Sequence, residues 1–171
     1  MTTVAISNSD FRAALGSFAS GVTVITGLAG DRPRGLTCQS FFSLSLRPPL
    51  VAVALSTTST SWPDIERSGA FCANVLTADQ AEICHRFAMS GGDKFAGLEW
   101  SPGPTGSPRI RGSHAWIECA IQQVLPAGDH FLAIGAILDL EIGGGRPLLF
   151  YRGELDELTE RATPGAESRG R

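Results

Sequence analysis

The sequence predicts a mainly β fold with short helices, in which mostly antiparallel strands form a closed or partly closed barrel. Roughly six or seven segments rich in β-branched and apolar residues have the length of strands and are bounded by turn residues. These segments do not alternate regularly with helical patterns, so a doubly wound parallel sheet is not expected. The 171 residues, of which 43% are hydrophobic and 18% charged, suffice for one globular domain.

The first third of the chain predicts one helix and three strands. The spacing of apolar residues in 9–21 predicts a short amphipathic helix. GVTVITG (21–27), TCQSFFSLSLRPPL (37–50) and LVAVALS (50–56) have the composition of strands, and the last is apolar throughout, as expected of a strand buried on both faces. DRPRG (31–35) predicts the turn between the first two strands.

The middle of the chain predicts two short helices that flank a strand. A serine- and threonine-rich loop, STTSTS (56–61), leads into the first helix, for which Ser61 is the expected N-cap. AFCANVL (70–76) is the predicted strand. TADQAEICHRFAMSGG (77–92) predicts the second helix, because its first four residues form a capping-box pattern.

The last third predicts a long hairpin and a short strand. A glycine- and proline-rich loop is expected at 97–113. HAWIECAIQQVL (114–125) alternates in polarity, and HFLAIGAILDLEI (130–142) is expected to pair with it across an AGD turn. PLLFYRG (147–153) predicts the final short strand.

The ends of the chain frame a single domain. Residues 1–8 are expected to be disordered, the domain to span 9–155, and 156–171 to form a flexible tail. No apolar run approaches the roughly 20 residues that span a bilayer, and the N-terminus has no secretory signal pattern. With a net charge of −3, these observations argue against nucleic acid or a membrane as partner and favour a cytoplasmic protein.

Familiar metal and nucleotide motifs are absent from the sequence. The four cysteines are scattered without a CxxC pair, and the three histidines are far apart, so no metal site is expected. The cysteines are instead expected to be reduced thiols packed among apolar residues. No GxGxxG follows a strand and no GxxxxGK[ST] occurs, so neither a Rossmann nor a P-loop nucleotide site is indicated.

Two hydroxyl-rich stretches are candidates for one ligand site. Thr37 and Ser40 offer hydroxyls beside backbone donors in a predicted strand. The loop 56–61 precedes a helix N-terminus, where hydroxyls and N–H groups can hold a phosphate. Taken alone, this loop is more often only a polar segment with a helix cap, by about two to one.

Two further motifs contain the single lysine and a histidine. GGDKF (91–95) places Lys94 beside an aromatic ring, which suits a flat anionic ligand, or it is a C-cap glycine followed by a solvated Asp–Lys pair. GDH (128–130) puts His130 at the start of a strand, where it lines a site or bonds a turn carbonyl. The four motifs together predict a ligand with a flat ring and a phosphate.

The order of these segments resembles the flavin reductase family. Over residues 9–155 the chain contains, in that family's order, GVTVITG, GLTCQSFFSLSLRPPLV, the serine/threonine loop ending in SW, FCANVL, DKFAGLEW, GSPRIRGSHAWIECAI, GDHFLAIGAI and PLLFYRG. The likeness is greatest to the small reductase components of two-component flavin-dependent monooxygenases. It implies a split β-barrel of the FMN-binding type and a homodimer.

The same resemblance implies an activity and the residues that serve it. It implies an NAD(P)H:flavin oxidoreductase that transfers hydride from NADH or NADPH to FAD or FMN and releases reduced flavin to a partner monooxygenase. The flavin would be bound by Thr37, Cys38, Gln39, Ser40, Phe41, Ser56, Thr57, Ser61, Trp62, Lys94 and Phe95. The nicotinamide nucleotide would face His130, Tyr151, Arg152 and Gly153, with His130 as the catalytic residue. Lys94 is also a candidate for stabilising the anionic reduced flavin.

Several alternatives stay open at this level. NADH is favoured over NADPH because no cluster of arginines marks a 2′-phosphate pocket, although Arg152 or Arg146 could serve as one. The choice between FAD and FMN is open. The competing function is a non-catalytic split-barrel protein that stores or senses flavin. A more distant one is an oxidase of the pyridoxamine-phosphate type, which should have a denser basic phosphate site.

Overall fold

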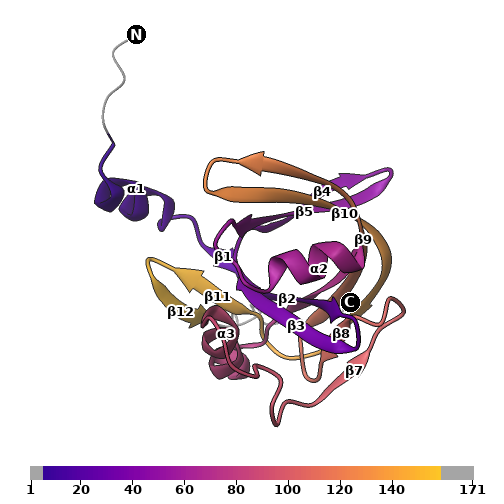
Figure 1. The fold of residues 1–171 in the computed structure, drawn as a ribbon. Helices are drawn as coiled ribbons and strands as arrows, with labels where there is room; N and C mark the ends of the chain where they lie inside the picture. Colours follow the sequence, from indigo (N-terminus) through magenta and orange to yellow (C-terminus); the bar gives the residue numbers. More distant parts are fainter. Residues whose placement is uncertain (1–5, 159–171) are drawn as a thin grey trace, which may run out of the picture.

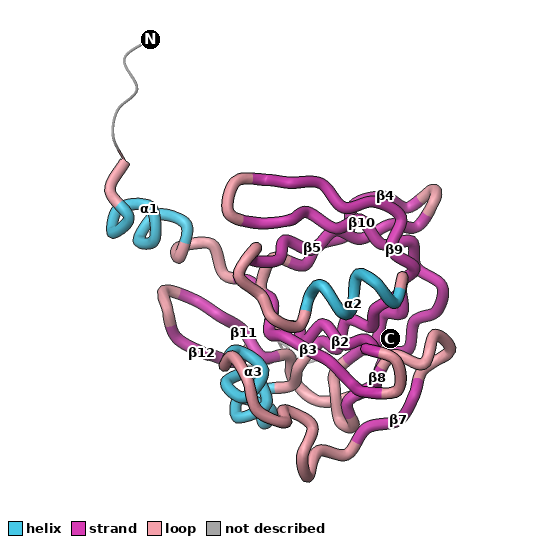
Figure 2. The backbone as a smooth tube through the Cα atoms, viewed as in Figure 1, coloured by secondary structure: helices cyan, strands magenta, loops and turns pink. Residues whose placement is uncertain are grey.

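The computed structural model describes residues 6–158, which form a curved, mainly antiparallel β structure with short helices (Figure 1, Figure 2). Its main sheet has the strand order β3-β2-β6-β9-β10-β5-β4, and every pairing in it is antiparallel. The strands are β2 (Thr23–Ala29), β3 (Arg32–Cys38), β4 (Phe41–Leu46), β5 (Pro49–Ser56), β6 (Ala70–Val75), β9 (Ala115–Ala127) and β10 (His130–Ile142). The prediction of a mainly β, mostly antiparallel fold is confirmed.

Smaller elements flank this sheet. One three-stranded sheet contains β1 (Ser20–Gly21), β11 (Leu148–Tyr151) and β12 (Glu154–Glu157), and a separate hairpin contains β7 (Trp100–Pro102) and β8 (Pro108–Ile110). The helices are α1 (Asn8–Leu15), α2 (Trp62–Ser68) and α3 (Ala81–Ala88), the last preceded by a 3₁₀ turn, η1 (Ala78–Gln80). Among residues 6–158, no helix is long and apolar enough to cross a membrane.

The barrel core is closed by α2. Figure 1 shows this helix between the layer of β2 and β3 and the layer of β5 and β10. Its residues Trp62 and Ile65 are fully buried there, against Ile25, Leu55 and Phe71. Burying side chains of this size contributes about 1.5–3 kcal/mol each, so α2 is held by packing although it has only seven residues.

A second apolar cluster attaches α3 to the outside of the barrel. Phe87 of α3 packs with Val24, Leu76 and Ile110, and its ring meets that of Phe95 edge-on at 5.0 Å. Gly35 makes this docking possible, because a Cβ at that position would lie 2.5 Å from the Phe87 ring. The helix therefore covers β3, one of the strands that border the site described below.

The structure corrects two strand predictions near the start of the chain. Residues 37–50 are not one strand: β3 ends at Cys38, β4 begins at Phe41, and β5 begins at Pro49. DRPRG is not a turn, because β3 starts at Arg32 and the turn lies at Gly30 and Asp31. Pro33 is tolerated because β3 is an edge strand of the sheet, where its missing N–H removes no ladder bond.

Three further predictions differ at element ends. The region 97–113 contains the β7–β8 hairpin, whose prolines stand at the strand ends. The first helix is capped by Ser7 and ends at Gly16, before the predicted limit at Gly21. The ELDE segment forms β12, so ordered structure extends beyond 155, and the rest of the predicted tails lies largely outside the described residues.

Two predicted caps are found in the structure. The capping box at Thr77 and Gln80 is confirmed, with reciprocal bonds between each side chain and the other residue's backbone. Ser61 is the N-cap of α2 but makes no capping bond with its side chain. Ser59 does so instead, accepting a bond from the Trp62 N–H at 3.2 Å.

Candidate functional site

A groove runs beside the ends of β3 and β5 and along the loop that enters α2. Its central part has a volume of about 460 Å³. It brings together eight of the predicted site residues, namely Thr37, Cys38, Gln39, Ser40, Ser56, Ser61, Lys94 and His130. Other walls come from Thr58, Ser59, Thr60, Met89 and Ser90, which were not predicted individually.

The hydroxyl-rich loop of this groove is held at both ends. Thr57 bonds the Asp129 carbonyl through both its N–H and its Oγ1, each at 3.0 Å. The Ser56 and Thr58 hydroxyls are 2.8 Å apart, and Ser56 Oγ also accepts from the Thr58 N–H. Because β5 and β10 pair Ser56 with His130, the loop and the GDH turn form one wall.

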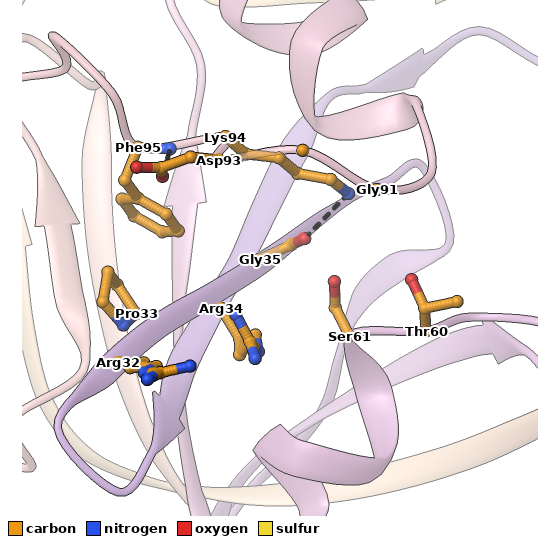
Figure 3. A pocket seen from close by; sticks show the side chains of 11 residues that line it. Arg32, Pro33, Arg34, Gly35, Thr60, Ser61, Gly91, Asp93, Lys94 and Phe95 are labelled. Carbon is orange, nitrogen blue, oxygen red and sulfur yellow. Dashed lines mark hydrogen bonds between the residues drawn. The ribbon is translucent and has the colours of Figure 1, made fainter.

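A second cavity of about 500 Å³ extends the groove past Ser61 and Lys94 (Figure 3). In Figure 3 the Ser61 hydroxyl points toward Gly35 and the Lys94 amine. The lining also includes Arg32, Arg34 and Phe95. These two arginines were not predicted from the sequence as site residues, because DRPRG was interpreted as a turn. Residues two apart on a strand lie on the same face, so their spacing could have indicated a shared site.

Lys94 is held in place by the fold. Its Nζ donates to the carbonyls of Gly35 at 3.2 Å and Phe87 at 3.0 Å, which ties β3 to the end of α3. An ammonium has three N–H groups, so one stays available to a ligand. Desolvation by burial lowers the pKa of Lys94, because the charged form loses water around it. The amine is therefore a positive charge fixed at the junction of the two cavities.

The GGDKF segment is a structured turn. Gly91 and Gly92 both have positive φ, at 81° and 69°, which a residue with a side chain rarely adopts. Asp93 Oδ1 accepts from the Phe95 N–H at 3.0 Å, and Phe95 is buried against Phe87. Of the Asp–Lys pair, Asp93 is exposed, as the alternative interpretation expected, whereas Lys94 is partly buried and bonded to carbonyls.

Thr37 and Cys38 are engaged by the fold. Thr37 Oγ1 donates to the Cys84 carbonyl at 2.6 Å, and Cys38 Sγ donates to the Ala54 carbonyl at 3.5 Å. Burial raises the pKa of the Cys38 thiol to about 11, which keeps it neutral at physiological pH. These two residues therefore offer a ligand mainly their backbone groups, whereas Gln39 and Ser40 have exposed side chains.

Three residues expected at the flavin lie outside the groove lining. Phe41 packs against the barrel core, and Trp62 is only 1% exposed inside it. Thr57 uses its side chain on the Asp129 carbonyl. Their contribution to the groove is thus to hold its walls in position.

His130 stands at the mouth of β10 and lines the central groove. Its Nδ1 is 2.7 Å from Asp129 Oδ1, which leaves Nε2 available. The hydrogen bond from His130 lowers the pKa of Asp129. The neighbouring carboxylate thus orients the imidazole ring at the edge of the groove.

The Tyr151–Gly153 segment lies beside a cavity that adjoins the central groove. Gly153 lines a cavity of about 340 Å³ that includes Thr37 and Gln39, and both of these also line the central groove. The guanidinium of Arg152 lies 5.2 Å from the centroid of the Tyr151 ring. Of the three residues predicted for the nicotinamide nucleotide in this segment, Gly153 lines this cavity with Thr37 and Gln39, whereas Tyr151 and Arg152 do not.

The donor set fits a flavin and a nicotinamide nucleotide. The walls consist of hydroxyls, backbone groups, an apolar floor and a few fixed cations, which suit flat rings that carry phosphates. Among residues 6–158, no cluster of three potential metal ligands occurs. The chemistry that this groove can support is stacking and orientation of two ring systems.

Comparison with known proteins assigns the chain to a family. Residues 15–159 match the family model described as flavin reductase like domain. The chain is 50% identical over 145 residues to the reductase subunit HsaB of a flavin-dependent monooxygenase from Rhodococcus jostii, covering 84% of this chain and 74% of that protein.

Solved structures give the same assignment. Nitrilotriacetate monooxygenase component B from Mycobacterium thermoresistibile superposes with a TM-score of 0.87 at 45% identity, covering 92% of this chain and 90% of that one. The Streptomyces globisporus NADH:FAD oxidoreductase SgcE6, solved with NAD and FAD fragments, gives 0.85 at 32% identity, covering 91% and 94%. The chain therefore belongs to the flavin reductase family and has its split-barrel fold.

Proposed function

We propose that this chain is an NAD(P)H:flavin oxidoreductase that reduces FAD or FMN with NADH or NADPH and releases the reduced flavin to a partner monooxygenase. The observation that carries the proposal is the shared wall of the central groove. There the hydroxyl loop and His130 are brought together by the pairing of β5 with β10. The names of the relatives, which are reductase components of flavin-dependent monooxygenases, support the same conclusion.

The residues of the groove bind and orient the two substrates. Hydroxyls at Ser56 and Ser61, with Lys94, hold the phosphate side of the flavin, and backbone groups from Thr37 to Ser40 line its ring. Hydride transfer between nicotinamide and flavin is supplied by the two cofactors themselves. His130, oriented by Asp129, contacts the nicotinamide nucleotide, and the charge of Lys94 favours the anionic reduced product.

NADH is the proposed reductant, and a homodimer the proposed assembly. The name of the NADH:FAD oxidoreductase among the structural relatives supports NADH. Two groups of exposed apolar side chains support the dimer, because such surface is often covered by a partner chain. One group lies on the N-terminal segment and the other on β10: Phe11, Leu15 and Phe18, and Leu138, Leu140 and Ile142. Light scattering should give twice the chain mass. We also propose a cytoplasmic location.

A spectrophotometric assay tests the activity. Purified protein is mixed with NADH or NADPH and an excess of FMN or FAD, and absorbance at about 340 nm is followed. Oxidation of the nucleotide should require added flavin. Flavin binding without any oxidation of either nucleotide would instead support the storage or sensing protein.

Replacement of His130 should affect the kinetic constants for the nicotinamide nucleotide and for flavin differently. In His130→Ala, kcat/KM for the nicotinamide nucleotide should fall about tenfold, the effect of losing one oriented contact. The KM for flavin should stay within about twofold, because the hydroxyl loop keeps its own bonds to Asp129. An equal loss for both substrates in a folded variant would contradict the assigned role.

A further inference from the structure

A further cavity lies between α1 and the turn that joins β11 to β12, beyond the groove. Its volume is about 460 Å³, and it is lined by Arg12, Ala13, Ser17, Arg152 and Gly153. Gly153 also lines the cavity that meets the central groove at Thr37 and Gln39. The cavity is thus the last of a row that begins at the hydroxyl loop. Figure 1 shows α1 above the β11–β12 hairpin.

Two arginines line this cavity, and neither forms a salt bridge within the described residues. Among residues 6–158, the arginines that form salt bridges are Arg34, Arg67, Arg109, Arg111 and Arg146. Arg146 pairs with Glu157, which removes it as a candidate for a phosphate. Arg12 and Arg152 have no such pair within the described range, as is also true of Arg32, Arg47 and Arg86. Two arginines at one cavity suit an anion of two charges.

The turn holds Arg152 in an unfavourable backbone conformation. Arg152 and Gly153 connect β11 and β12 with φ of 52° and 90°, as in a two-residue type I′ turn. The first position of such a turn favours Asn, Asp or Gly, and Arg152 is the single non-glycine residue with positive φ among those described. An arginine at this position therefore does not favour the turn, although the residue lines the cavity.

The same turn fixes the second arginine. The Arg152 N–H donates to the Gly16 carbonyl at 2.9 Å, just after the end of α1. Arg12 is one turn earlier on that helix and faces the same cavity. The bond between the two segments therefore holds both arginines at the border of one cavity.

We propose that Arg12 and Arg152 bind a phosphate group of the reduced nicotinamide nucleotide, which makes α1 part of the substrate site. The inference rests on the proposed function and deepens it. The phosphate is either the pyrophosphate, common to NADH and NADPH, or the 2′-phosphate of NADPH. In the second case the subsite selects NADPH, against the expectation from the sequence.

The test measures binding apart from turnover. Titration calorimetry is performed with ADP-ribose and with 2′-phospho-ADP-ribose on the full chain and on three variants. Arg12→Gln retains a helix former, and Arg152→Asn removes the guanidinium while installing a residue that the turn prefers. Arg111→Gln removes an exposed charge elsewhere, in a surface pair with Glu99, and is the matched control.

Each outcome decides the proposal. Arg12→Gln and Arg152→Asn should each weaken binding about tenfold, and Arg111→Gln should change it by less than about twofold. Weakening with both probes assigns the pyrophosphate, and weakening with only the second assigns the 2′-phosphate. Unchanged affinity in folded variants, or no binding of either probe to the unaltered chain, overturns the subsite. Failure of the proposed function is recognised separately, as binding without oxidation of NADH or NADPH.

Discussion

Two groups of charged side chains differ in whether their charges are paired within the fold. Arg109, on β8, donates to the carboxylates of Glu118, Asp139 and Glu141 on β9 and β10. Glu118 is fully buried and also accepts from Thr105. In contrast, Lys94 at the groove has only carbonyl partners and keeps one N–H. The cluster in which Arg109 bonds three carboxylates holds strands together. The Lys94 amine, whose partners are two carbonyls, can still bind a ligand.

The largest expected effect is a loss of stability when the Arg109 cluster is broken. Arg109→Met leaves the Glu118 carboxylate buried without its cation and should lower the free energy of unfolding by about 3–5 kcal/mol. Chemical denaturation measures this change. The KM for flavin in the folded fraction should stay within about twofold, because Arg109 lines neither cavity of the groove.

A double variant controls this prediction. Arg109→Met with Glu118→Gln removes the uncompensated charge and should recover part of the lost stability. A single variant as stable as the original protein would mean that the cluster is not what fixes β8 to the sheet.

Lys94→Met should instead affect ligand binding more than stability. Loss of the fixed charge should raise the KM for flavin about tenfold, the effect of one charge-assisted contact. In the original protein this KM should rise with pH below the ordinary lysine range, because the lowered pKa makes the amine lose its proton earlier. The variant should have a high KM with no such pH dependence. Steady-state kinetics over a pH series provides the measurement, and an unchanged KM at neutral pH would contradict the role.

The smallest effect on flavin binding is expected at Cys38, a groove residue whose side chain already has a hydrogen-bond partner in the fold. Cys38→Ala should leave the KM for flavin within about twofold, because the thiol bonds Ala54 and does not face the ligand as an anion. Its pKa of about 11 also predicts slow alkylation by iodoacetamide at neutral pH in the folded protein. Rapid modification together with loss of flavin reduction would show that the thiol itself reaches the site.

The same contrast explains what the sequence could and could not reveal about the fold. Local signals were sufficient for the long hairpin and for the capping box at Thr77, because both depend on neighbouring residues. The strand at 32–38 was misread because its proline and arginines resemble a turn. It is stabilised as a strand by its pairing with β2 at the sheet edge and by the packing of Phe87 over Gly35.

The site was predictable to the extent that its motifs are contiguous. The hydroxyl loop, Lys94 and His130 were recognised as motifs, and the fold brings them to one groove. The engagement of Thr37 by the Cys84 carbonyl could not be seen, because it depends on where α3 docks. Arg12 and Arg152 line one cavity because the β11–β12 turn bonds Gly16, a contact between the two ends of the domain.

The central claim, that the groove reduces a flavin and then releases it, is tested most directly by separating protein from flavin after turnover. A small amount of protein is incubated without oxygen with NADH and a large excess of FMN or FAD, and then passed through a membrane that retains the protein. Reduced flavin is expected in the filtrate, in many-fold excess over protein. Reduced flavin found only with the retained protein, at one equivalent per chain or fewer, would contradict it.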